Sequence, residues 1–324
     1  MRSIIVLVAG LAALVSQHAG LAQETEPFQT RNLSPPIAIF GMPAWESVTD
    51  EQVFTATVEV ANHYRLSRRG PDTLIIDGET LRTTLFYSHP IGTQWSFSAE
   101  LPVLQQTGGV LDDLIDGWHS AFGLPDGGRN NRPEDDLLFQ LARDGRAFFT
   151  LDDDRRGIGD LQLSLARRFG RDGGFLARAA AKIPTGREGM LAGSGSGDWS
   201  ITLLRPRPAM LRGRAAGYFW GVGWLDLGAP KVVAFPVEEG SLIGIVGGGL
   251  KVLPRFGIKA QIDVYSAMYD TPLEELGQNA AQITIGGWRD MGARGRIEFA
   301  ISEDLHVSTA PDVVLHFAMR WTWQ

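Results

Sequence analysis

The final segment of the chain alternates strictly between hydrophobic and polar positions. The apolar positions are Leu315, Phe317, Met319, Trp321 and Trp323, and the positions between them include His316, Arg320 and Thr322. A period of two predicts a β-strand with two different faces. The apolar face would suit the core of a soluble one-sided sheet. It would equally suit the lipid-facing surface of a membrane barrel, whose polar face lines the lumen.

Similar alternating segments recur from Gln52 to the end of the chain and predict about fourteen antiparallel strands. Short connections, such as the hairpin signal Asp144-Gly145, alternate with long ones, such as 65–79 and 103–136. Only 205–213 is long for a turn. Short periplasmic turns and long external loops are typical of an outer-membrane barrel, which also needs an even strand number. Twelve strands would follow if the 137–151 hairpin belonged to a loop.

Charged residues of these segments fall on the polar face, and the apolar faces of the clear strands carry essentially none. A charge near the midplane of the lipid face costs roughly 2–4 kcal/mol, so this sorting favours a barrel over a soluble sheet. With Glu59 included, this face carries six basic and four acidic groups, which are expected largely to pair across the bore. Such pairing does not favour a wide, strongly anion-selective pore. The lumen and ligand candidates are Arg82, Glu100, Arg178, Lys182, Lys259, Asp263, Arg296, Glu298, His316 and Arg320.

Aromatic residues lie near several predicted strand ends. Such residues commonly form girdles at the two membrane interfaces. The predicted girdle residues are Tyr64, Tyr87, Trp224, Tyr269, Trp288 and Trp323.

The N-terminus predicts export. Arg2 precedes an apolar run from Ile4 to Val15, and small residues at Gly20 and Ala22 complete a signal peptide over residues 1–22, cleaved before Gln23. The run is too short to span a bilayer as a helix. Residues 23–51 contain four prolines and no clean period, so we expect an irregular arm, outside or inside the barrel mouth. Residues 52–324 would form the barrel.

Composition narrows the chemistry further. The chain of 324 residues has no cysteine, which excludes disulfides and thiol catalysis, and a net charge of -7, which argues against general nucleic-acid binding. No metal, cofactor or catalytic motif is predicted, because neither a His-Glu-x-x-His nor a Gly-x-Ser-x-Gly pattern occurs. His316 is the single candidate base for a barrel hydrolase, although a histidine satisfied within the lumen is the favoured interpretation.

One segment of the longest loop has helical rather than strand spacing. Apolar residues from Val110 to Phe122 recur at intervals of three and four, and Gly123 and Pro125 end the pattern. This short amphipathic helix would either pack on the rim or fold into the mouth as a constriction. The residues of this candidate lid are Asp112, Asp116, Trp118, His119, Phe122 and Arg129.

Several phrases resemble known outer-membrane proteins. The segments 31–36, 112–129 and 157–160 resemble a proteobacterial family of outer-membrane β-barrel proteins of unknown function. The segments 182–186 and 195–198 are similar to phrases in outer-membrane proteins linked to aromatic-compound degradation. The resemblance implies a location and a fold, and no established activity. In one departure, Gln324 follows the aromatic residue on which such barrels usually end.

Together these patterns predict an all-β protein: a single, monomeric, antiparallel barrel in the outer membrane of a Gram-negative bacterium. The leading hypothesis for its function is passage or capture of a small molecule through a narrow lumen. Two alternatives stay open, a barrel hydrolase acting on lipid or peptide and a structural envelope protein without transport. The expected partners are outer-membrane lipid, the barrel assembly machinery, periplasmic chaperones and a small-molecule permeant.

Overall fold

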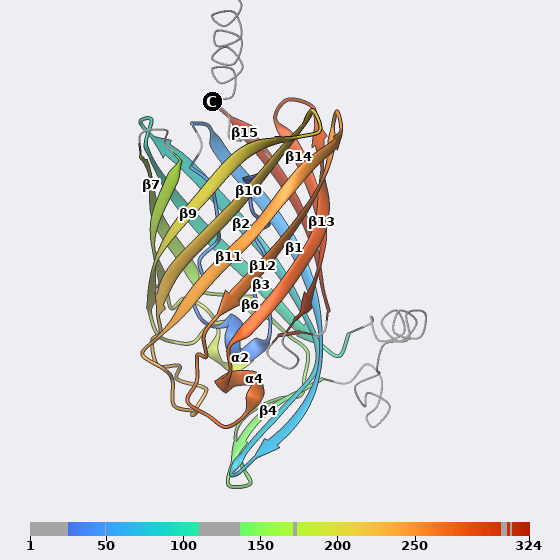
Figure 1. Ribbon diagram of the computed structural model, residues 1–324. Helices are drawn as coiled ribbons and strands as arrows, with labels where there is room; N and C mark the ends of the chain where they lie inside the picture. The colour runs from blue at the N-terminus through green and yellow to red at the C-terminus, as the bar shows by residue number, and fades with distance from the viewer. Residues whose placement is uncertain (1–24, 49, 110–136, 171–173, 306–309, 312) are drawn as a thin grey trace, which may run out of the picture.

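A closed antiparallel β-barrel is the architecture of the chain in the computed structural model, which describes residues 25–48, 50–109, 137–170, 174–305, 310–311 and 313–324 (Figure 1). Twelve strands within these ranges form the wall, and β1 pairs with β15 from Gln52↔Trp323 to Asn62↔Val313 to close it. The wall strands are β1 (Gln52–Arg69), β2 (Asp72–Ile91), β3 (Trp95–Thr107), β7 (Leu161–Phe169), β8 (Phe175–Ile183), β9 (Asp198–Leu211), β10 (Arg214–Asp226), β11 (Gly240–Leu253), β12 (Phe256–Tyr265), β13 (Ala280–Met291), β14 (Gly295–Asp304) and β15 (Val313–Trp323).

Three further strands attach to the wall beyond one end of the barrel. They are β4 (Leu138–Arg143), β5 (Arg146–Leu151) and β6 (Arg155–Ile158). β4 pairs with the outer part of β2, β5 with β4, and β6 with the outer part of β3. The barrel therefore has twelve strands rather than fourteen, because the hairpin at Asp144-Gly145 belongs to the external region.

The long loop predicted at 65–79 is wrong. β1 and β2 instead continue past the wall as one hairpin that is paired throughout, from Asn62↔Glu79 to Arg69↔Asp72. A tight turn containing Gly70, with φ of 55°, joins them. The projecting part of β2 offers its backbone edge to β4, which explains why the 137–151 hairpin is recruited here and not into the wall.

The two ends of the barrel differ (Figure 1). Short turns gather at the end where the C-terminus lies, which we call the short-turn end, and the loops gather at the other, the loop end. The expected long turn at 205–213 is also short, because β9 continues to Leu211 and turns through Arg212 and Gly213, both with positive φ. Within the described residues, three short helices belong to the loop end: α2 (Pro35–Ala38), the 3-10 helix η3 (Glu188–Met190) and α4 (Glu274–Gly277). In the described ranges, no helix is both long and apolar enough to cross a membrane.

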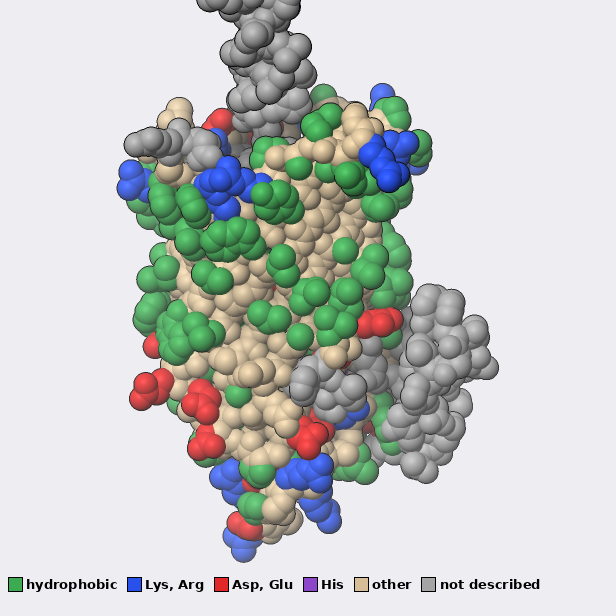
Figure 2. All heavy atoms as spheres, in the orientation of Figure 1, with side chains coloured by type: hydrophobic (Ala, Val, Ile, Leu, Met, Phe, Trp, Pro, Cys, Tyr) green, Lys and Arg blue, Asp and Glu red, His purple; other side chains and the backbone are tan. Residues whose placement is uncertain are grey.

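The outer surface of the wall carries a broad apolar belt (Figure 2). Phe317, Met319 and Trp321 lie on it, as their alternation predicts, whereas Ala318 between them and His316 just before them are buried inside. The girdle prediction is wrong for two of its aromatic residues. Tyr269 packs inside the loop end, and Trp288 faces the lumen because it shares the inward parity of Gln282 and Thr284 in β13.

A charge placed on the belt should destabilise the barrel. Ile285 is 58% exposed near the middle of β13. Changing Ile285→Arg is expected to lower the free energy of unfolding in lipid by roughly 2–4 kcal/mol, because the guanidinium would face hydrocarbon. The matched change Leu211→Arg, beside a short turn, should cost about 0–1 kcal/mol. Equilibrium unfolding in guanidinium chloride measures both, and equal losses would contradict the placement of the belt.

Candidate functional site

The N-terminal arm, residues 25–48, fills the lumen. It precedes β1 in sequence, and its side chains are almost entirely buried, including Phe28, Leu33, Trp45 and Val48. Glu26 begins it near the short-turn end, α2 reaches the loop end, and the carbonyl of Val48 returns to accept a hydrogen bond from Arg168 at the end of β7. The arm therefore crosses the bore twice, which settles its predicted place as inside the barrel.

The outgoing limb of the arm is held by basic residues of the wall. Arg320 and Arg296 pair with the carboxylate of Glu26, the latter at 3.5 Å. The ammonium group of Lys259 donates to the backbone carbonyl of Glu26 at 2.7 Å and lies 3.9 Å from the centre of the Phe28 ring. One carboxylate of the arm thus lies among three cations of the wall.

The remaining charges of the arm meet the opposite side of the wall. Arg31 pairs with Glu100 at 2.8 Å, and Arg82 pairs with the same carboxylate at 3.1 Å. On the returning limb, Glu46 pairs with Arg178 at 2.8 Å. The expectation that lumen charges pair largely across the bore is therefore wrong in part, because four of the pairings described, two of them at Glu26, run between arm and wall instead. The arm brings counter-charges that the strand pattern could not reveal.

A charged centre made of Asp160, Lys182 and Asp198 anchors the arm at the loop end. The Lys182 ammonium lies 3.1 Å from Asp160 and 2.8 Å from Asp198, and all three side chains are at least 95% buried. It also donates to the carbonyl of Ile39, while the Asp198 carboxylate accepts the N–H of Gly41 at 2.7 Å. The centre therefore joins the arm to the wall.

The same centre also orders the neighbouring loops. Asp160 accepts backbone N–H groups from Gly186 and Ser194, and Asp198 accepts one from Gly228. Buried carboxylates that accept several such bonds are costly to leave unpaired. These residues fix the loops 184–197 and 227–239 over the barrel end.

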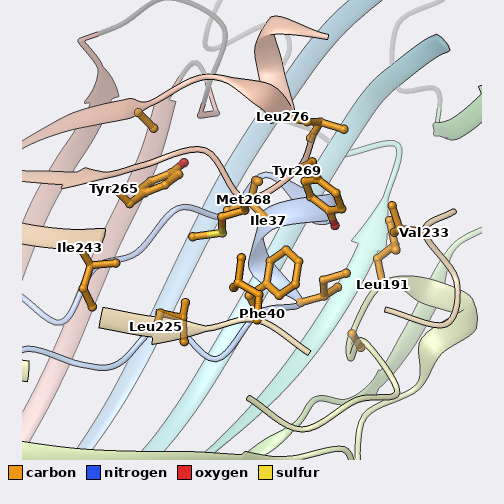
Figure 3. Close-up of a cluster of buried hydrophobic side chains, with 14 of the residues drawn as sticks. Ile37, Phe40, Leu191, Leu225, Val233, Ile243, Tyr265, Met268, Tyr269 and Leu276 are labelled. Carbon is orange, nitrogen blue, oxygen red and sulfur yellow. The ribbon is translucent and has the colours of Figure 1, made fainter. Parts of the chain in front are cut away.

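A hydrophobic cluster closes the loop end (Figure 3). Ile37 and Phe40, at α2, pack against loop residues that include Met268 and Leu276. The Tyr269 hydroxyl donates to the carbonyl of Pro36 at 2.7 Å. Because the arm supplies the middle of this cluster, closure of the mouth and filling of the lumen depend on the same segment.

The projecting hairpin leans on the same loops. Arg143 in β4 donates to both oxygens of Asp72 in the projecting part of β2, at 2.7 and 3.2 Å, and Thr271 donates to Asp72 at 2.8 Å. The hydrogen bonds from Arg143 hold the pKa of this carboxyl below its usual range. Arg143 also lies over the ring of Phe235, which contacts Phe148 edge-on. The projecting β1–β2 hairpin is thus held against β4 and the neighbouring loops.

Little space remains between arm and wall. Two adjoining cavities beside Glu100 and Gln162 offer about 10 and 20 Å³ to water. A single water needs roughly 10–15 Å³ by this measure, so each cavity accommodates one water or so and no organic solute. Within the described part of the chain, the structure therefore represents a closed state.

All ten predicted lumen residues have their side chains on the inner side of the wall. The predicted lid residues of 112–129 lie outside the described residues. The sequence missed Asp160 and Asp198, although each ends a Gly-x-Gly-Asp phrase, at 157–160 and 195–198. It also missed the arm residues Glu26, Arg31 and Glu46, for which no periodicity gave a signal.

His316 makes contacts that do not resemble a catalytic dyad with a nucleophile. Its Nδ1 lies 3.3 Å from Glu59, its ring meets Phe28 edge-on, and its buried Nε2 has no partner among the described residues. In the same ranges, no three His, Asp or Glu side chains converge as a metal site. The charge arrangement around the lumen suits holding a segment or an ion.

Comparisons with known proteins agree with this architecture. The model of a family described as "Protein of unknown function (DUF3187)" matches residues 3–323. A search of curated proteins finds no match. Among solved structures, the COG4313 outer membrane channel from Pseudomonas putida F1 is similar, with a TM-score of 0.52 and 11% identity over 88% of this chain and 98% of that one. At this identity, the likeness concerns the fold.

Two other solved structures are similar at lower TM-scores. The P. putida toluene transporter TodX has a TM-score of 0.42 and 12% identity, covering 86% of this chain and 91% of its own. A Pseudomonas aeruginosa FadL homologue has a TM-score of 0.42 and 9% identity, covering 94% and 97%.

Proposed function

This chain belongs to the DUF3187 family of proteins of unknown function, and we propose that it is an outer-membrane channel for a small solute, closed by its own N-terminal arm. The apolar belt supports a place in the membrane, and the short turns would face the periplasm. The proposal includes export by the signal peptide over residues 1–22. It also includes insertion as a monomer by the barrel assembly machinery after escort by periplasmic chaperones.

One observation carries the proposal: a segment that is not part of the wall fills a bore whose lining carries buried charged side chains. Interiors of barrels with about eight strands are filled by wall side chains, and larger barrels leave space. Here the arm supplies the filling through ion pairs and hydrogen bonds at Glu26, Arg31 and Glu46. Polar contacts of this kind can be exchanged for water when the arm leaves the bore. The apolar contacts of the arm, such as those of Trp45 in its cluster with Phe219 and Ile245, must be broken as well and hold the closed state.

Weakening these contacts should open the channel. The double change Glu26→Gln and Glu46→Gln removes both carboxylates of the arm while keeping their size. Each lost hydrogen bond to a charged group costs roughly 1.5–3 kcal/mol, so we expect the open fraction to rise at least about tenfold, since 1.4 kcal/mol corresponds to a factor of ten. Single-channel recording of the refolded mature protein in planar bilayers measures this fraction.

A matched control is Glu274→Gln, which alters an exposed pair with Arg69 on the loop side. It should leave the open fraction unchanged, because exposed pairs contribute little. If the mature protein and the double variant were both silent, the channel would be rejected. The structural envelope protein would then be the better account, since the closed mouth and filled lumen are what such a protein needs.

A further inference from the structure

The wall residues around Glu26 are of the types that bind anions. We define the Glu26 site as Lys259, Trp288, Arg296 and Arg320 of the wall, together with Glu298, which lies 3.3 Å from Lys259. The two guanidinium groups converge on one carboxylate, a geometry that matches carboxylate anions. Arg320 has a described ion-pair partner only in Glu26, so withdrawal of the arm would leave this cation without one.

The charges of the wall favour an anion in that position. Around the site, four cations face two carboxylates of the wall, because Asp290 pairs with Arg296 at 3.3 Å and with Lys251 at 3.4 Å. The excess of two positive charges falls to one when Glu26 is present. The groups in this count are Lys251, Lys259, Arg296 and Arg320 against Asp290 and Glu298.

An aromatic surface adjoins these charges. The Lys259 ammonium lies 3.9 Å from the ring centre of Phe28 in the arm and 5.9 Å from that of Trp288 in the wall. Trp288 is 1% exposed, and its ring N–H has no hydrogen-bond partner among the described residues. A buried donor without an acceptor is unusual and costs free energy. It would gain a partner if a ligand oxygen came within reach.

We propose that the Glu26 site binds an aromatic carboxylate, with its carboxylate in place of Glu26 and its ring in place of Phe28. The arm presents these two groups two residues apart, and the wall offers a complement to each that persists when the arm leaves. This inference deepens the proposed function, and it rests on that proposal for the movement of the arm. The arm then acts as an internal competitor, and the permeant lowers the free energy of the open state by replacing it.

Direct binding tests the inference without requiring conduction. Isothermal titration calorimetry of benzoate into the detergent-solubilised mature protein should show weak binding to the wild type. The change Glu26→Gln should tighten benzoate binding by about tenfold or more, because removing an internal competitor raises the fraction of binding-competent protein. Adding Arg320→Gln to that variant should reverse the gain. Near-ultraviolet circular dichroism of each variant confirms that the barrel is folded.

Benzamide and acetate separate the two halves of the ligand. Benzamide keeps the ring and the shape but has no charge, and acetate keeps the charge without the ring, so each should bind at least about tenfold more weakly than benzoate. Equal binding of either would overturn the inference. So would an equal gain from Glu46→Gln, which loosens the arm at Arg178 but leaves Glu26 in place. A silent bilayer with intact benzoate binding would reject the channel and keep the site.

Discussion

Changing Lys182→Met is expected to lower the free energy of unfolding by about 3–5 kcal/mol, because it leaves buried carboxylates without their cation. Lys182 is the one basic group within 4 Å of both Asp160 and Asp198 among the described residues. Both carboxylates accept backbone N–H groups of surrounding loops, so neither can move into solvent without breaking those bonds. We expect the midpoint of guanidinium chloride unfolding to fall accordingly.

A second lysine provides the control. Lys251→Met removes a partner of Asp290 at 3.4 Å, but the Lys251 side chain is 30% exposed and Asp290 retains Arg296. Its loss should cost at most about 1 kcal/mol. Adding Asp198→Asn to Lys182→Met should recover part of the stability, since one unpaired charge is removed. If Lys182→Met were as mild as Lys251→Met, the charged centre would not anchor the loop end.

The wall was predictable because alternation reports directly which face of a strand meets an apolar surface. This held for β15, whose alternating residues Phe317, Met319 and Trp321 face outward. The strand count was not fixed in the same way. The 138–151 hairpin has strand character wherever it lies, and its place depends on the projecting edge of β2, which no local pattern records.

The arm was not predictable from periodicity, because its backbone bonds mostly to side chains of the wall instead of forming a sheet. The Phe28 N–H donates to Gln261, and the carbonyl of Ile39 accepts from Lys182, over separations of more than 140 residues. Proline content correctly suggested an irregular segment. Its location follows only from partners that are distant in sequence, whereas the inward placement of Trp288 follows from its parity with Gln282 and Thr284 in β13.

The repeated Gly-x-Gly-Asp phrases are a signal in the sequence for the charged centre. Assigning strand residues to the inner or outer face does not use this signal. Asp160 follows Gly159, and an added Cβ at Gly159 would lie 2.8 Å from Pro102. Asp198 follows Gly197 in the second phrase. Small residues there let backbone and loops approach the carboxylates closely. A lysine on an inward face, between two such phrases, would have predicted the charged centre.

A covalent link between arm and wall should abolish conduction. The chain has no cysteine, so a pair introduced by Gly41→Cys and Asp198→Cys can form a single defined disulfide. A Cβ added at Gly41 would lie 3.4 Å from the Cβ of Asp198, close to the roughly 3.5–4.5 Å of a disulfide. The same Cβ would lie 2.9 Å from the Cβ of Lys182, so the arm must shift by a few tenths of an ångström. Lys182 keeps Asp160 as its partner.

The oxidised variant is expected to show no openings in planar bilayers, and addition of dithiothreitol should restore them in the same membrane. The physical reason is that Gly41 lies in the arm between α2 and the returning limb. A disulfide from this position to the wall would keep both the mouth and the bore filled by the arm. The single change Gly41→Cys should show no response to oxidation or reduction. Openings of equal frequency in the oxidised and reduced forms would mean that the solute path bypasses the arm, and the arm would then be a fixed part of the barrel core.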